Sequence, residues 1–172
     1  MSGAYQSVGV TVGYEASDAD ARRWRIEALR RYAGESVEDV ITRRFESASV
    51  RAPDIPITAD QHRWMERVAA TVRGVHRDFL AVADAPSNGE YSPRMLMFDE
   101  SASVALQVGP DAVEVIPLPD YDGDARRGFA LMWRLCQALA RDAECIIVDP
   151  TDLTVVEMQL DVDRAREEYG WL

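Results

Sequence analysis

The sequence predicts an α+β fold in which a mostly antiparallel sheet of about five to six strands packs against three to four helices. Three observations point to this class. Apolar residues recur at helical spacing between residues 58 and 79, short apolar runs typical of strands follow residue 94, and Gly- or Pro-containing turns separate those runs. A chain of 172 residues can fold without a metal or a disulfide. We therefore expect a single domain over residues 1–172, with a loop at residues 85–90 between a helix-rich part and a strand-rich part.

The first third of the chain predicts one strand and two helices. Valines at every second position indicate a strand over Tyr5–Tyr14. Ser17 fits a helix N-cap and acidic residues follow it, so we expect a helix from Ser17 to Tyr32 that stops at Gly34. Residues 36–47 carry apolar side chains at helical spacing but also fit a strand, and helix is the preferred interpretation.

The clearest helix signal lies in the middle of the chain. Thr58 and Gln61 have the spacing of a capping box. An apolar stripe then predicts a helix that continues through Phe79 and ends before the loop at residue 85, with its apolar face in the core. The stripe consists of Trp64, Val68, Val72, Val75 and Phe79.

Three short strands and a turn are predicted after the loop. The strands are expected over Met95–Phe98, Val104–Val108 and Ala112–Leu118, and a Gly-Pro-Asp turn joins the last two. Because proline lacks a backbone N–H, Pro117 and Pro119 suggest that the third strand ends at a sheet edge.

The C-terminal part alternates helix and strand. A wide apolar stripe predicts a helix over Arg126–Asp142, and a short buried strand follows over Cys145–Val148. After an Asp-Pro turn we expect a strand over Leu153–Met158 and a short polar helix over Asp161–Tyr169, against which Trp171 could pack.

The charge composition excludes several function classes. The chain has 30 Asp plus Glu, and all 19 of its basic residues are arginines, which gives a net charge of −11. Without lysine it has no Schiff base and no phosphate-loop lysine, and its negative charge argues against binding nucleic acid. No signal peptide or membrane span is recognisable, so we expect a cytoplasmic protein. A GC-rich genome would explain the missing lysine, but it would not explain the acidic excess.

The acidic loop at residues 120–124 invites a calcium-binding interpretation. An EF-hand that began at Asp120 would need Gly and Glu where this chain has Ala125 and Leu131. We therefore expect Asp122 or Asp124 to cap the following helix instead.

The remaining titratable residues also predict no cofactor and no metal. His62 and His76 lie fourteen residues apart on one expected helix, about 21 Å along its axis, so they would not share an ion. Cys136 and Cys145 fall in apolar segments and are expected to be buried and inert.

A carboxylate pair is the enzymatic option that remains. Asp149 with Asp152, or Asp99 with Glu100, could act as acid and base if their environments separated their pKa values. In a chain with 30 acidic residues such pairs also occur by chance.

The acidic surplus is concentrated toward the C-terminus. Nine acidic residues lie between Asp142 and Glu168, where Arg164 and Arg166 are the basic residues. This asymmetry fits either a solvated face or a docking surface that attracts a cationic protein.

The order of elements resembles a group of small acidic α+β proteins from actinobacteria, several of which look like immunity proteins that neutralise a toxin encoded beside them. The likeness rests mainly on Gly128–Met158, where a helix leads into the strand CIIV and the Asp149-Pro150 turn, and more loosely on Tyr5–Tyr32. Such proteins commonly have Gln after the proline, whereas this chain has Thr151. The resemblance implies a function but carries over no functional residues.

The leading hypothesis is an immunity- or antitoxin-like inhibitor that covers the active cleft of a basic toxin. An enzyme with a carboxylate-based site and a subunit of a homo-oligomer are the alternatives. Carboxylates and aromatic anchors in loops and at the C-terminus are the expected contacts. The candidate partner-binding residues are Asp120, Tyr121, Asp122, Asp149, Asp152, Tyr169 and Trp171.

Overall fold

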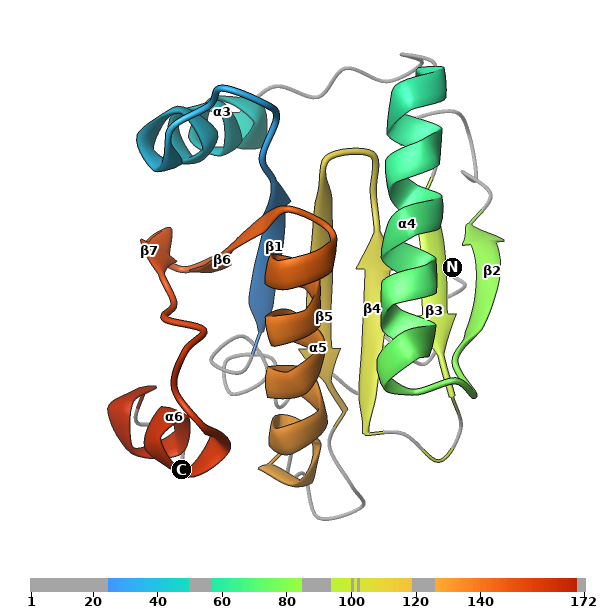
Figure 1. The fold of residues 1–172 in the computed structure, drawn as a ribbon, viewed down its shortest axis with the longest axis vertical. Helices are drawn as coiled ribbons and strands as arrows, with labels where there is room; N and C mark the ends of the chain where they lie inside the picture. Colours follow the sequence, from blue (N-terminus) through green and yellow to red (C-terminus); the bar gives the residue numbers. More distant parts are fainter. Residues whose placement is uncertain are drawn as a thin grey trace.

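A seven-stranded antiparallel sheet organises the chain and confirms the α+β class (Figure 1). The computed structural model describes residues 25–49, 57–84, 94–99, 101, 103–118 and 126–169. Within these residues the strand order is β2-β3-β4-β5-β1-β6-β7. The elements are β1 (Ile26–Arg30), α3 (Val37–Ser49), α4 (Ala59–Val75), β2 (Leu80–Asp84), β3 (Arg94–Phe98), β4 (Val104–Val108), β5 (Ala112–Pro117), η1 (Arg126–Gly128), α5 (Phe129–Asp142), β6 (Cys145–Asp149), β7 (Thr154–Val155) and α6 (Val162–Tyr169).

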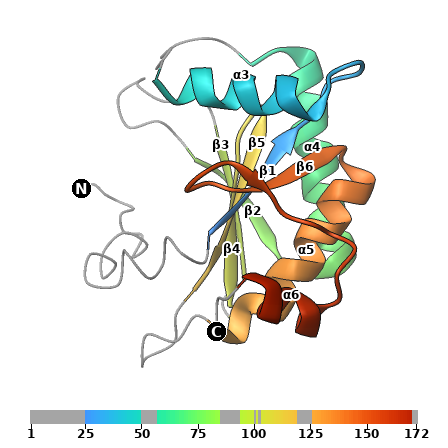
Figure 2. The same cartoon turned by 90° about the vertical axis from the view of Figure 1, so that its left-hand side faces the viewer.

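The helices cover the two faces of the sheet differently. Figures 1 and 2 show α4 and α5 against one face, while α3 crosses one end of the sheet. The main core lies between the sheet and the α4–α5 layer and includes Leu106 and Trp133, both fully buried. A second, smaller core joins Val40 of α3 to Leu29 of β1 and Ile146 of β6 on the opposite face.

β1 corrects the expected helix from Ser17 to Tyr32. Residues 26–30 form an inner strand that pairs with β5 on one side and β6 on the other. Ile26 and Ala28 enter the main core, whereas Glu27 and Leu29 point to the opposite face. Two ladders of backbone hydrogen bonds and burial on both faces outweigh the local helix signals. Residues 17–24 and the predicted strand Tyr5–Tyr14 lie outside the described residues.

The next helix is confirmed, and its start has a local cause. Residues 36–47 were expected to be helical, and α3 runs from Val37 to Ser49. The Ser36 hydroxyl accepts a hydrogen bond from the Asp39 backbone N–H, and the Asp39 carboxylate accepts one from the Ser36 N–H, both at 3.0 Å. This reciprocal pair satisfies donors that a helix N-terminus otherwise leaves free.

The predicted capping box of α4 is confirmed, but the helix ends earlier than expected. Thr58 and Gln61 exchange side-chain hydrogen bonds with each other's backbone N–H at 3.0 Å. The helix stops at Val75, and Phe79 is buried in the turn that follows. The sequence prediction missed β2, which the five-residue ladder with β3 holds extended.

The remaining strands of the sheet agree with the prediction except for the place of β5 and the length of β7. β3, β4 and β6 are confirmed, but β5 is an inner strand rather than an edge strand. Its proline is tolerated because Pro117 is the last residue of the strand, opposite Val104. The strand expected over Leu153–Met158 is reduced to the two residues of β7.

The helix expected over residues 126–142 begins with the 3₁₀ turn η1 and continues as α5. Its N-cap is Gly128, where a Cβ atom would clash with the Ser103 carbonyl oxygen, so only glycine fits this close approach. The predicted caps Asp122 and Asp124 lie outside the described residues. No helix of the described part combines the length and the apolar character that a membrane crossing requires.

Candidate functional site: the acidic edge of the sheet

The β6–β7 turn presents two of the predicted site residues, and local hydrogen bonds fix their carboxylates. Asp149 accepts a hydrogen bond from the Thr151 N–H at 2.8 Å, and Asp152 accepts one from the Thr154 N–H at 3.0 Å. The bond from Thr154 lowers the pKa of Asp152, so this carboxylate stays charged. Leu153 completes the turn with a φ of 59°, in the left-handed region.

Two side chains of α5 pin the segment that follows β7. The Trp133 indole N–H donates to the Leu160 carbonyl at 2.8 Å, and the Gln137 amide donates to Met158 at 2.8 Å and to Leu160 at 3.2 Å. Val156, which directly follows β7, is 3% exposed and belongs to the main core. The backbone that carries the acidic residues is therefore part of the folded body.

α6 extends the acidic surface. The Asp161 carboxylate caps the helix by accepting the Arg164 N–H at 2.8 Å, and Ala165 is fully buried against the main core. Arg166 lies over the ring of Phe129, with 5.5 Å between its guanidinium carbon and the ring centroid. This contact turns one of the few positive charges of the segment toward α5 and leaves acidic side chains on the outer face.

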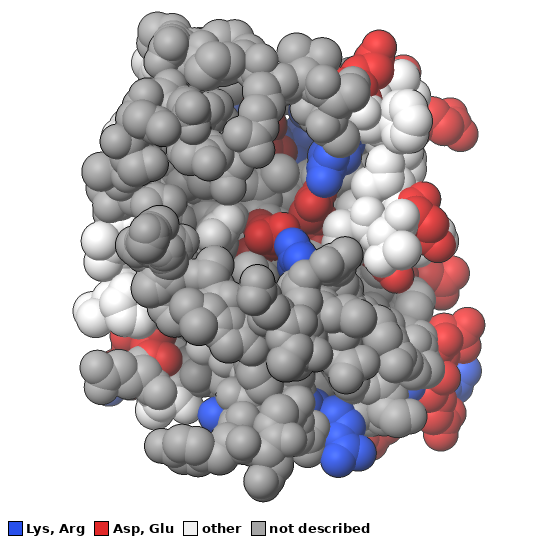
Figure 3. Space-filling view, turned by 180° about the vertical axis from the view of Figure 1, so that it is seen from behind, with Lys and Arg blue, Asp and Glu red and all other residues white. Residues whose placement is uncertain are grey.

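We call this surface the acidic edge. It combines seven acidic residues, six of them exposed and Asp149 half-buried, with two arginines. Figure 3 shows acidic side chains along the side of the molecule that holds α3, β7 and α6, with uncharged surface between them. The acidic edge consists of Asp149, Asp152, Glu157, Asp161, Asp163, Glu167 and Glu168.

The structure brings only part of the predicted site together. Asp149 and Asp152 belong to the acidic edge, and Tyr169 is the last residue of α6. The other four candidates lie outside the described residues; they are Asp120, Tyr121, Asp122 and Trp171.

Sequence reasoning missed the exposure of apolar side chains on α3 and β7, which lie on the same side of the molecule (Figure 1). Phe45 of α3 is 70% exposed and Val155 of β7 is 40% exposed. The available signal was the spacing of five residues between Phe45 and the buried Val40. Because a helix has 3.6 residues per turn, a residue five positions from a buried one points away from the buried face.

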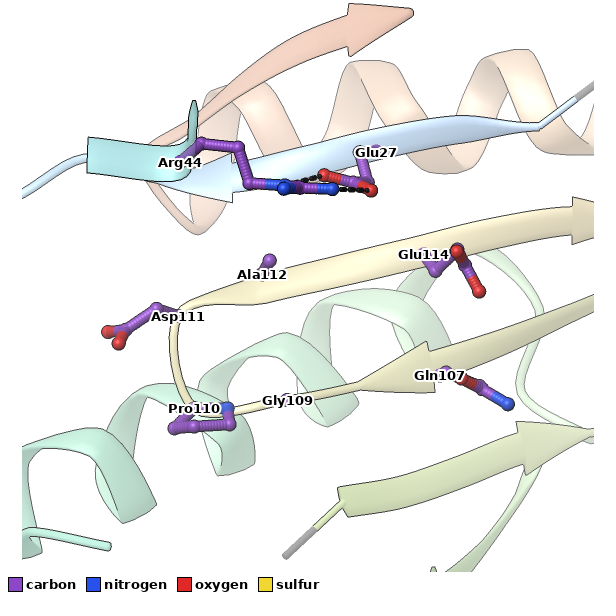
Figure 4. A pocket seen from close by; sticks show the side chains of 8 residues that line it. All are labelled: Glu27, Arg44, Gln107, Gly109, Pro110, Asp111, Ala112 and Glu114. Carbon is purple, nitrogen blue, oxygen red and sulfur yellow. Dashed lines mark hydrogen bonds and ion pairs between the residues drawn. The ribbon is translucent and has the colours of Figure 1, made fainter. Parts of the chain in front are cut away.

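A polar hollow on the sheet face opposite α4 and α5 is a second candidate site. It has a volume of about 330 Å³ and lies beside α3, β1 and the β4–β5 turn (Figure 4). Glu27, 7% exposed, accepts two hydrogen bonds from Arg44, at 2.6 and 2.9 Å. Next to it Glu114 accepts a hydrogen bond from Arg25 at 3.1 Å.

The register of the sheet explains why these charges meet. Glu27, Glu114 and Gln107 lie opposite one another on β1, β5 and β4, so they form a polar row across three strands. Bonding to Glu27 raises the pKa of Arg44. Because both carboxylates are bound to arginines, the cluster fits a structural tether between α3 and the sheet better than an acid–base site.

Asp149 and Asp152, one of the carboxylate pairs proposed for catalysis, bind separate backbone N–H groups. The Asp99 carboxylate accepts the Ser101 hydroxyl at 2.5 Å and lies 3.1 Å from the His76 Nε2, while Glu100 lies outside the described residues. Since the carboxylate stands between the histidine and the serine, His76 does not contact the hydroxyl as a general base would.

The cysteine thiols are buried, and the metal-ligating side chains of the described residues do not cluster. Cys136 and Cys145 are buried as predicted, and burial raises the pKa of both, which disfavours the reactive thiolate. No group of three or more His, Cys, Asp or Glu side chains suited to a metal occurs in the described part of the chain.

Comparisons with protein-family models, with curated proteins and with solved structures found no match for this chain.

Proposed function

We propose that this chain is a cytoplasmic binding protein of the immunity or antitoxin type, which covers the active cleft of a cationic toxin. One observation carries the proposal: the acidic edge presents seven carboxylates and two arginines on a backbone that α5 holds in place. A concentrated charge of this kind speeds association with a partner of opposite charge and rejects acidic competitors.

The mechanism is steric and needs no chemical step. Exposed carboxylate–arginine or carboxylate–lysine pairs contribute only about 0.2–1 kcal/mol each, so the charges select and orient the partner more than they hold it. Tight binding requires apolar anchors that lose water at the centre of the interface. Val37 and Phe45 of α3 and Val155 of β7 are exposed apolar side chains on elements of this side of the molecule.

Co-expression with the product of the adjacent gene tests the proposal. If that product is toxic alone, this chain should restore growth and should bind it with an affinity that falls as salt rises. Persistent toxicity in the presence of folded protein would contradict the immunity function.

A matched pair of variants tests the surface. Replacing Glu167 and Glu168 by Gln removes two exposed charges from the acidic edge and should slow association several-fold at low salt. Replacing Glu66 and Asp78, which are exposed in and after α4, by Gln and Asn serves as the control. Equal slowing by both pairs would indicate an effect of net charge rather than a docking surface.

A further inference from the structure

β2 is an edge strand whose outward side chains are apolar. Among the strands of the described residues it pairs only with β3. Leu80 is 58% exposed and Val82 is 49% exposed, and both lie on the sheet face opposite the main core. Across the ladder they face Phe98 and Leu96, which are half-buried, so the exposed surface continues onto β3.

The two edges of the sheet differ in how they are protected. β7 has two residues and is flanked by acidic side chains, which are common devices against edge-to-edge pairing. β2 has five residues, LAVAD, with no proline and with its single charge at the last position. A strand of that length and character is a template for pairing with another strand.

The sequence of β2 favours a second copy of this chain as its partner, because an antiparallel copy places apolar residues of the strand opposite each other. Residues 80–83 and 95–98 carry no charge; of the acidic residues that flank β2, Asp84 is in register with Arg94, and the exposed Asp78 lies in the turn before the strand. The acidic edge lies at the opposite end of the sheet, six strand spacings away, or about 29 Å. That distance exceeds the Debye length of about 8 Å at physiological salt, so two chains of charge −11 can meet at β2 with little repulsion between their acidic edges.

We propose that two copies pair antiparallel through β2 around a two-fold axis perpendicular to the sheet, which joins their sheets into one. In the register that matches apolar side chains, Leu80 lies opposite Val82 of the second copy and Ala81 lies opposite Ala81. Both copies then present their apolar side chains on the same face, because the axis preserves the faces of the sheet. This dimer does not depend on the proposed toxin-binding function, and it leaves both acidic edges free at the far ends of the joined sheet.

The mass of the full chain in solution is the first test. Sedimentation at physiological salt should give twice the 19.2 kDa chain mass at high concentration and one chain mass on dilution. Val82→Lys should weaken the dimer about 100-fold, because the two-fold axis repeats each buried charge. Val155→Lys, which alters an exposed valine on the other edge strand, should leave the dimer unchanged. A wild-type chain that stays monomeric at every concentration would overturn the proposal, as would a dimer that Val155→Lys dissociates and Val82→Lys does not.

Complementary charges test the register. Val82→Lys and Leu80→Glu should each be monomeric, and circular dichroism should show that both remain folded. Mixed together they should form a heterodimer, because the introduced lysine of one chain then faces the introduced glutamate of the other, while the unchanged Leu80 and Val82 face each other. If the two folded variants remain monomeric after mixing, the proposed pairing is wrong.

Discussion

On the sheet face that α4 and α5 cover, Ile26 and Ala28 of β1 are fully buried in an apolar layer. On the opposite face, the next residue along the same strand, Glu27, is almost as buried but is bound to Arg44 of α3. One strand thus supplies a dry core on one side and an ion pair on the other. α5 is therefore held mainly by burial of apolar surface, whereas α3 is held by a small core and by charges whose strength depends on pH and salt.

Trp133→Ala tests the apolar face and should have the largest effect. The ring is fully buried and stacks on Phe129 with 5.9 Å between centroids, so its loss should lower the free energy of unfolding by about 3–5 kcal/mol in urea titrations. Trp133→Phe should cost less, because Gln137 still donates to the Leu160 carbonyl. A loss below about 1 kcal/mol for the alanine variant would contradict the assignment of this residue to the main core.

Glu27→Ala tests the ionic face and should have the next largest effect. It removes both hydrogen bonds to Arg44, which should cost about 1–3 kcal/mol of unfolding free energy. The double variant Glu27→Leu with Arg44→Met should recover most of that loss, because apolar residues of similar volume often replace a buried ion pair without cost. If the double variant is as unstable as Glu27→Ala, the ion pair stabilises the fold more than apolar residues of similar volume would. The two faces would then differ less than we propose.

Contacts between neighbours in the sequence could be predicted, whereas contacts between distant segments could not. The α4 capping box was predictable because Thr58 and Gln61 are three residues apart and bond to each other. β1 was not, because its partners are Val113 and Ile147, more than eighty residues along the chain. Without β1 as a strand, no sequence pattern brings Glu27 to Arg44.

The same distinction applies to the candidate site. The acidic residues of the C-terminal segment could be counted directly, and Asp149 and Asp152 bond two residues ahead, within their own turn. Their presentation on one edge depends on contacts from Trp133 and Gln137, which the sequence does not reveal.

Glu114→Gln tests the more exposed ion pair of the polar row. The side chains of Arg25 and Glu114 are 30% and 26% exposed, so solvent screens their interaction. We expect a loss of about 0.2–1 kcal/mol that disappears in high salt, measured by urea titration at two ionic strengths. A loss that persists in high salt would indicate that the Glu114 hydrogen bond, rather than its charge, stabilises this face.

Acid should loosen α3 before it loosens α5, and this is the smallest effect we expect. Glu35 accepts hydrogen bonds from Arg43 at 2.8 and 3.1 Å, and these bonds together with the nearby positive charge lower the pKa of Glu35 below its ordinary value of 4.5. A carboxylate with a lowered pKa in the folded state stabilises that state fully above its unfolded pKa, and the contribution is lost as pH falls through the folded pKa.

Hydrogen exchange measures this loss helix by helix. Between neutral pH and pH 5, α3 amides should keep constant protection once the intrinsic exchange rate is corrected, and below pH 4.5 their protection should fall before that of α5. Glu35→Gln should remove most of this pH dependence in α3 while α5 is unchanged, because the amide that replaces the carboxylate carries no titrating charge. If α3 and α5 lose protection together at every pH, the two faces unfold as one unit, and the difference between them concerns the type of interaction but not local stability.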